Sequence, residues 1–419
     1  MSLIRTSLLN AIAVAVRMLT MLGLSKLLAV YVGPAGYAVI GQFQNAVTMI
    51  LSFASGAINT GVTKYTAQYH EDTAMQHSLW RTAGMISFST AITVSVLIAI
   101  FNRTLALLVL KDAGLGSVFL WLAGCLSLFV LNTLLLAILN GKKAVSSYVT
   151  ANIATSIVTL LATWALASVW GLYGALVALA INQSVVAFVT LALCLRSGWF
   201  SMSMLFGKLD RAIARQLAAF ALMAIATAVT APLSQLLIRN HLVQHFGWDA
   251  AGYWQAVSRI SDMYLMLITT TLTVYYLPRL SEIKDGPELK KEIRRVYRFV
   301  LPVTVLGAAM VYVLRHWIIQ LVFTADFTPM LDLLAWQLVG DVIKIGSWVQ
   351  SFVMLGRAMT KAYIATEVIF SLSLVLLTYW LTPIFGLQGS VIAFAANYVL
   401  YWICIAVILH KAGHKMDNQ

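Results

Sequence analysis

Residues 115–140 read LGSVFLWLAGCLSLFVLNTLLLAILN and contain no charged side chain. A helix needs about 20 mostly apolar residues to cross the hydrocarbon core of a bilayer, so this segment predicts a membrane-spanning helix. Residues 145–169, VSSYVTANIATSIVTLLATWALASV, repeat the pattern after Lys142 and Lys143. A membrane β-barrel would show short segments of alternating polarity instead of such continuous apolar runs. The sequence therefore predicts an all-α integral membrane protein.

The composition of the whole chain agrees with this prediction. Of 419 residues, 61% are apolar and only 10% are charged, whereas about a quarter of the residues in soluble domains are charged. Apolar windows between turn and charge signals predict twelve transmembrane helices. Their expected limits are 7–32, 38–60, 82–102, 115–140, 145–169, 172–196, 212–239, 250–277, 297–323, 329–355, 360–382 and 387–410.

The formal net charge of +13 is explained by topology. With a cytoplasmic N-terminus, the outer segments contain only Arg103, Lys111 and Arg239 as bases, while the inner segments contain most of the others. This asymmetry follows the positive-inside rule and predicts that both termini are cytoplasmic. We therefore expect the bilayer, and no nucleic acid, as the partner of the basic residues. The three cysteines lie in apolar stretches without metal-ligand spacing, and we predict no metal site, cofactor or catalytic residue.

An internal repeat divides the predicted helices into two halves of six. A shift of 215 or 216 residues superposes three groups: Gly141, Lys142 and Tyr148 on Gly356, Arg357 and Tyr363; Gly171, Leu172 and Gly174 on Gly386, Leu387 and Gly389; and Ala35-Gly36-Tyr37 on Ala251-Gly252-Tyr253. Because six is even, both halves have the same orientation in the membrane. We expect an N-terminal lobe at 1–200, a cytoplasmic linker at 201–211 and a C-terminal lobe at 212–419, around a central cavity. Two such lobes favour a transporter that rocks about that cavity.

Charged residues inside the first span are candidates for the cavity. A charge at bilayer depth costs about 2.5–3.5 kcal/mol, so it needs a partner or water. Arg17 lies near the midplane and shares a helix face with Asn10. Lys26 is nine residues further and faces the opposite side of a straight helix, unless Gly23 bends the span. An unpaired cation in the cavity favours an anionic substrate, and we expect Arg17 to provide it, with Lys26 as the alternative.

Two further spans carry polar stripes at spacings of four and three, which place the side chains on one helix face. The eighth span has Gln255, Arg259 and Asp262, and the tenth has Gln337, Asp341 and Lys344. Either these are neutralised pairs that hold helices together, or they line a wet substrate path. Both interpretations stay open for each stripe.

Glu367 in the eleventh span has no base three or four residues away. It is our candidate for a carboxylate that binds a proton or a sodium ion and couples transport to an ion gradient. Burial, or a cation on another helix, would explain it otherwise.

Four motifs indicate a family. They are Gly33-Pro34-Ala35-Gly36; Gly61-Val62-Thr63-Lys64-Tyr65 with Gln68-Tyr69-His70; Ile260-Ser261-Asp262; and Trp336-Gln337-Leu338-Val339-Gly340-Asp341-Val342 with Lys344 and Gly346. With these motifs the chain resembles the Wzx-type flippases of lipid-linked oligosaccharides, in the polysaccharide transporter branch of the multidrug/oligosaccharidyl-lipid/polysaccharide superfamily.

This resemblance implies a function. Such proteins move an undecaprenyl-pyrophosphate-linked glycan from the cytoplasmic to the periplasmic leaflet of the bacterial inner membrane, without making or breaking a bond. It also implies cations in the first span, which matches Arg17 and Lys26, and we include Lys64 among the expected substrate-binding residues. A polysaccharide polymerase and a chain-length regulator are the implied protein partners.

Two other functions are alternatives. A multidrug exporter of the same superfamily would prefer acids to cations in its cavity. A membrane-embedded glycan polymerase or ligase would need a large outer loop with catalytic Arg or His, and the predicted outer loops are short. The carried glycan is left open between the lipid III and O-antigen classes.

Overall fold

The computed structural model describes residues 3–283, 286–357 and 359–416, and these residues form helices and connecting turns without a β-strand. They fall into two compact units. The N-terminal unit contains residues 1–32 and 39–236, and the C-terminal unit contains residues 33–38 and 237–419. The lobe limits expected from the repeat stay a prediction, because these units are defined by contacts and not by internal symmetry.

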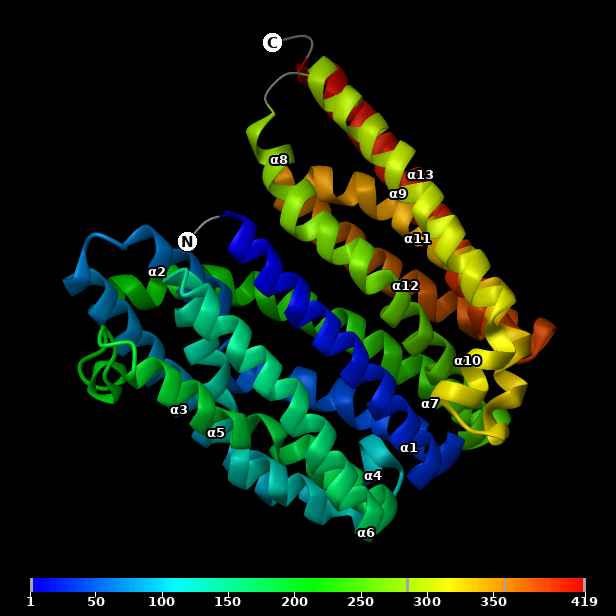
Figure 1. The fold of residues 1–419 in the computed structure, drawn as a ribbon, viewed down its shortest axis with the longest axis horizontal. Helices are drawn as coiled ribbons and strands as arrows, with labels where there is room; N and C mark the ends of the chain where they lie inside the picture. Colours follow the sequence, from blue (N-terminus) through cyan, green and yellow to red (C-terminus); the bar gives the residue numbers. More distant parts are fainter. Residues whose placement is uncertain (1–2, 284–285, 358, 417–419) are drawn as a thin grey trace. The chain divides into compact units, whose positions relative to one another are not determined.

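The N-terminal unit is built mainly from long apolar helices. Its elements are α1 (Leu3–Ala54), α2 (Asn59–Gln68), α3 (Thr73–Ile100), α4 (Asn102–Leu110), the short η1 (Ala113–Leu115), α5 (Gly116–Gly141), α6 (Val145–Leu195), η2 (Met202–Leu205) and the first part of α7 (Arg211–Thr271). Helix α5 packs against both α3 and α6, which lie beside it in Figure 1. The core of this unit is accordingly formed by α5, whose central and last turns are largely buried.

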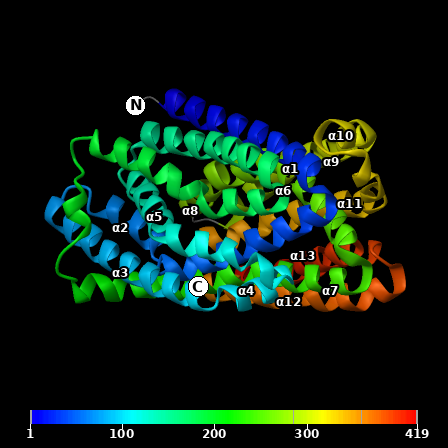
Figure 2. The ribbon, with the colours of Figure 1, turned by 90° about the horizontal axis from the view of Figure 1, so that it is seen from below.

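The C-terminal unit continues with the second part of α7. Its further elements are the π-helix η3 (Leu272–Tyr276), α8 (Leu277–Glu282), α9 (Gly286–Val313), α10 (Arg315–Val322), η4 (Ala325–Met330), α11 (Leu331–Gly356), α12 (Thr360–Phe385) and α13 (Gln388–Met416). Helix α11 packs against α9 and α13, and α12 runs beside α13 (Figure 2).

Two glycines let α13 approach α11 closely. A Cβ atom added to Gly340 would collide with the ring of Phe394, and one added to Gly346 would collide with Trp402. The hydroxyl of Tyr297 on α9 donates a hydrogen bond of 2.7 Å to the Gly346 carbonyl oxygen. Larger residues at these positions would separate the helices, so the glycines set the spacing of the candidate site described below.

Single glycines interrupt three of the longest helices. Gly33 in α1, Gly171 in α6 and Gly247 in α7 have φ values of 64°, 54° and 85°, which a residue with a Cβ atom adopts only with strain. Gly386, with φ 61°, ends α12 in the same way. Gly33 pairs with Gly247, and Gly171 with Gly386, at nearly the separation of the predicted repeat.

The chain is a multi-pass membrane protein. Among the described residues, eight helices are long and apolar enough to cross a membrane. Two of these, Ala11–Ala54 and Val145–Leu195, have 44 and 51 residues, about twice the length of one span, and each contains an interrupting glycine. The total of twelve spans agrees with these interruptions and stays a prediction.

Some helix limits differ from the prediction. Helix α3 begins at Thr73 instead of residue 82, because the Asp72 side chain caps it by accepting a hydrogen bond of 2.9 Å from the Met75 amide. Helix α9 begins at Gly286 and ends at Val313, so the span expected at 297–323 starts earlier and is broken before α10. Polar or charged residues in the first turns hide such starts from an apolar window, because the window detects only the apolar part of a helix.

Arg239 is buried within a long helix. The sequence places this residue at the outer end of the seventh span, and in the structure it lies inside α7 and is 1% exposed. Its side of the membrane stays a prediction. Its guanidinium donates a hydrogen bond to the Gln255 side chain and lies 5.5 Å from the ring centroid of Trp254. Both partners come from the helical segment after Gly247, so Arg239 fastens the two segments of α7 together.

Candidate functional site

A buried carboxylate lies at the centre of the C-terminal unit. Asp341 on α11 is fully buried and accepts two hydrogen bonds. The Tyr264 hydroxyl on α7 donates one at 2.9 Å, and the Gln337 side-chain amide donates the other at 3.2 Å. Gln337 lies one helical turn before Asp341, as the predicted stripe requires, whereas Tyr264 comes from a distant part of the chain. These donors offset part of the cost of burying the carboxyl group.

Lys344, one turn further along α11, is surrounded by aromatic rings. Its Nζ atom lies 5.0 Å from the ring centroid of Trp348, 5.8 Å from Phe394 and 5.9 Å from Tyr398. At such distances the ring faces attract a cation. The carboxylates of Asp262, Asp341 and Glu367 also act on its charge. Among the described residues, Lys344 forms no ion pair within 4.0 Å with any of these three carboxylates. Its ammonium group is therefore stabilised by the aromatic rings and by charges at longer range.

Glu367 on α12 completes this group. Its side chain is half-buried, and its Oε1 atom lies 3.4 Å from the hydroxyl of Tyr401 on α13. The same hydroxyl lies 3.1 Å from Oγ of Ser351 on α11. We call Asp341, Lys344 and Glu367 the ionic cluster. A carboxyl group that faces a neutral hydroxyl instead of a paired base can take up and release a proton or a small cation.

Of the polar residues predicted in the eighth span, Asp262 interacts with the ionic cluster and, within the described part of the chain, Arg259 does not. Asp262 is exposed, and its charge acts on Lys344, while Arg259 is half-buried. Among the described residues no Arg259–Asp262 ion pair is found within 4.0 Å. Arg259 and Asp262 are therefore not the close ion pair that the structural interpretation, a neutralised pair holding helices together, requires.

The predicted site residues of the N-terminal unit lie on two helices, α1 and α2. Arg17 is exposed on α1, and Lys26 is half-buried and lines a pocket between α1 and α6. Lys64 is exposed on α2, with its Nζ atom 5.4 Å from the ring centroid of Tyr65. Asn10 belongs to α1, but its side chain lies outside the described residues. Their role in substrate binding stays a prediction.

Three aromatic members of the site lie on the last helix and are not among the residues predicted from the sequence. Phe394, Tyr398 and Tyr401 contact Lys344 or Glu367, and all three belong to α13. Their spacing of four and three residues is the same as in the two polar stripes, which is the signal that would have found them.

The chain is similar to known proteins in sequence and in fold. The family model described as "Polysaccharide biosynthesis protein" matches residues 27–332. The chain belongs to this family. The chain is also similar to the lipid III flippase of Escherichia coli (strain K12). The two sequences are 32% identical over 424 residues, and the alignment covers 98% of this chain and 99% of the relative. The lipid III flippase of Shigella flexneri matches to the same extent. The resemblance found from the sequence motifs is thereby confirmed.

Similar solved structures confirm the predicted transporter fold of this family member. An inward-facing multidrug resistance MATE family transporter of the MOP superfamily is similar with a TM-score of 0.78 at 14% identity, over 96% of this chain and 95% of that one. The lipid II flippase MurJ, in an inward closed conformation, is similar with a TM-score of 0.75 at 14% identity, over 97% of this chain and 87% of MurJ. At such low identity these likenesses concern the fold alone.

Proposed function

We propose that this protein is a flippase that moves an undecaprenyl-pyrophosphate-linked oligosaccharide from the cytoplasmic to the periplasmic leaflet of the bacterial inner membrane. The observation that carries the proposal is the 32% identity to a lipid III flippase along nearly the whole length of both chains. The protein acts as a translocase and not as an enzyme. Its preferred cargo is of the lipid III class, by analogy with that relative, and an O-antigen unit is the alternative.

The proposed mechanism is alternating access of two lobes. The glycan and pyrophosphate occupy a polar cavity, and the isoprenoid chain stays in lipid. Arg17 binds the pyrophosphate, since an arginine can bind phosphate oxygens with two hydrogen bonds. The further substrate-binding candidates are Asn10, Lys26, Lys64, Arg259, Asp262, Asp341 and Lys344. The multidrug-exporter alternative is supported only by structural likeness at 14% identity, so we prefer the flippase.

We assign coupling to Glu367 of the ionic cluster. Glu367 binds a proton or a sodium ion in one state and releases it in the other. No cofactor is needed for this cycle. The distribution of bases supports cytoplasmic termini, and a polysaccharide polymerase with its chain-length regulator would receive the glycan on the periplasmic side.

The function is tested by depleting the protein from its native cell. We expect one class of undecaprenyl-pyrophosphate-linked glycan to accumulate on the cytoplasmic face of the inner membrane, and the chemical composition of that glycan identifies the cargo. An accumulating O-antigen unit would replace lipid III as the cargo. Unchanged levels of all lipid-linked glycans would contradict the proposal.

A further inference from the structure

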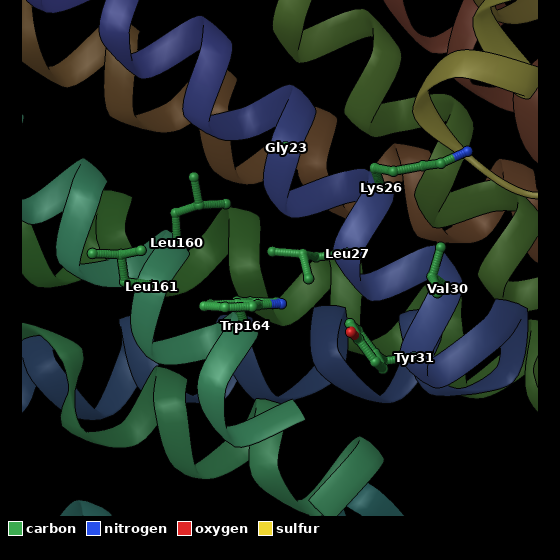
Figure 3. Close-up of a pocket in the computed structure, with 8 residues that line it drawn as sticks. All are labelled: Gly23, Lys26, Leu27, Val30, Tyr31, Leu160, Leu161 and Trp164. Carbon is green, nitrogen blue, oxygen red and sulfur yellow. The ribbon is translucent and has the colours of Figure 1, made fainter. Parts of the chain in front are cut away.

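A pocket of about 490 Å³ lies between α1 and α6 of the N-terminal unit. Figure 3 shows its lining residues, which are Gly23, Lys26, Leu27, Val30 and Tyr31 from α1 and Leu160, Leu161 and Trp164 from α6. A Cβ atom added to Gly23 would lie 3.3 Å from Cδ1 of Leu160, so a larger residue at this position would crowd the wall of the pocket. The volume is in the range of small-molecule binding sites, which are also mostly apolar with a few polar groups.

The pocket combines an apolar floor with one cation at its edge. Leu160, Leu161 and Leu27 lie around the indole ring of Trp164, whereas the Lys26 ammonium points away from them (Figure 3). Leu161 and Trp164 are each more than half exposed, so the floor opens to the surface of the unit. On a membrane protein, an open apolar floor of this kind suits a lipid chain.

Lys26 and Trp164 lie at matching positions along their helices. Each is seven residues before an interrupting glycine, Gly33 for Lys26 and Gly171 for Trp164. At 1.5 Å per residue, both lie about 10 Å from the ends of their helical segments. A cation at this depth reaches toward the interface with its long side chain, and there it can meet a phosphate group.

We propose that this pocket binds the first isoprene units of a polyprenyl phosphate, with Lys26 facing the phosphate. This inference rests on the proposed function, because it assigns to the pocket the lipid part of the proposed cargo. The pocket is an added contact for the first units of the chain, where it leaves the pyrophosphate, and the rest of the chain stays in lipid. This contact would hold the lipid to the N-terminal unit while the glycan moves.

The transition from cation to apolar lining favours an isoprenoid over a phospholipid. Next to Lys26 the pocket presents Leu27, Val30 and Gly23, all within one helical turn. In a polyprenyl phosphate the apolar chain begins directly at the phosphate oxygen. In a glycerophospholipid, glycerol and two ester groups stand between the phosphate and the chains, and they would be buried here beside apolar side chains at a cost.

Photolabelling tests this inference. The full-length protein in phosphatidylglycerol-containing nanodiscs is labelled with farnesyl diphosphate that carries a diazirine on its chain, and the labelled peptides are mapped by mass spectrometry. We expect labels on residues 160–164. Leu160→Trp and Gly23→Leu, which fill the pocket from opposite walls, should remove most of this labelling. Val169→Trp, at an exposed α6 position outside the pocket, should leave it unchanged.

Competition between unlabelled ligands and the photolabel tests the roles of Lys26 and of the apolar lining separately. Unlabelled farnesyl diphosphate should compete about tenfold more weakly in Lys26→Gln than in the wild type, which is the effect of losing one charge-assisted hydrogen bond. Competition by the uncharged farnesol should be the same in both proteins. Equal competition by added phosphatidylglycerol, or labelling that Leu160→Trp and Gly23→Leu both leave intact, would overturn the inference.

A parallel flipping assay distinguishes this inference from the proposed function. If wild-type vesicles flip the lipid-linked glycan but residues 160–164 are not labelled, the pocket assignment is wrong and the flippase stands. If these residues are labelled competitively but no glycan is flipped, the pocket binds isoprenoids and the proposed function is wrong.

Discussion

The hydroxyl of Tyr264 donates a hydrogen bond of 2.9 Å to Oδ2 of Asp341 and so joins α7 to α11 inside the C-terminal unit. Asp341 is fully buried, which makes the loss of a donor costly. This bond connects one of the two predicted polar stripes to the helix that carries the other.

Removing the Tyr264 hydroxyl should destabilise the protein. We expect Tyr264→Phe to lower the free energy of unfolding by about 1.5–3 kcal/mol, because a hydrogen bond to a charged group is lost. Thermal unfolding of the detergent-solubilised protein measures the effect, and Tyr275→Phe is the control, at a tyrosine that is 57% exposed. In an Asp341→Asn background the loss should be much smaller. Equal losses in both backgrounds would mean that the two residues are not coupled.

Arg17→Ala should abolish flipping while the protein still inserts and accumulates. The side chain is exposed on α1, so its removal costs little stability, but it takes away the proposed pyrophosphate ligand. Arg17→Lys should retain part of the activity because the charge survives. Leu19→Ala, at a 69% exposed position of the same helix, is the control. If Arg17→Ala transports normally at equal abundance, Lys26 replaces Arg17 as the cation of the cavity.

The double variant Arg259→Gln with Asp262→Asn separates substrate binding from structural pairing. Because these side chains form no close ion pair in the structure, we expect the variant to fold and to be inactive in transport. Protein abundance and flipping are measured together. Full activity would remove both residues from the site, and a destabilised single variant that the second substitution repairs would favour structural pairing.

Glu367→Gln should uncouple flipping from an ion gradient. A membrane potential contributes about 2.3 kcal/mol per elementary charge per 100 mV, and a carboxylate that changes its occupancy between two states can use this energy. In reconstituted vesicles we expect the variant to bind the lipid-linked glycan but to lose the gradient dependence of flipping. Glu71→Gln, at an exposed position between α2 and α3 and outside the candidate spans, is the control. Unchanged gradient dependence would eliminate Glu367 and leave Asp262 or Asp341 as candidates.

Single-helix patterns predicted part of this site and could not predict the rest. The spacing of Gln337, Asp341 and Lys344 places them on one face of α11, and the bond between Gln337 and Asp341 follows from it. Tyr264, Tyr398 and Tyr401 come from other helices, and periodicity within a helix does not state which helices become neighbours. The close approach of α13 at Gly340 and Gly346 decides that contact.

The same limit applies to Arg239 and to the N-terminal pocket. A charge near the end of an apolar run is read as a loop residue, but Gln255 and Trp254 make its burial possible. The place of Lys26 in the first span makes it the alternative to Arg17 as the cation of the cavity. Its position beside Leu160 and Trp164 depends on how α1 meets α6, which only the structure reveals.

Transbilayer movement of the glycan tests the central claim most directly. Vesicles that contain a fluorescent undecaprenyl-pyrophosphate-linked glycan are prepared with the wild-type protein, with the Arg17→Ala variant or without protein. A membrane-impermeant glycosidase is then added outside. We predict that wild-type protein exposes the glycan of the inner leaflet to the enzyme, while Arg17→Ala vesicles and protein-free vesicles lose only their outer-leaflet glycan. Cleavage in wild-type vesicles that stops at the extent seen without protein would contradict the account.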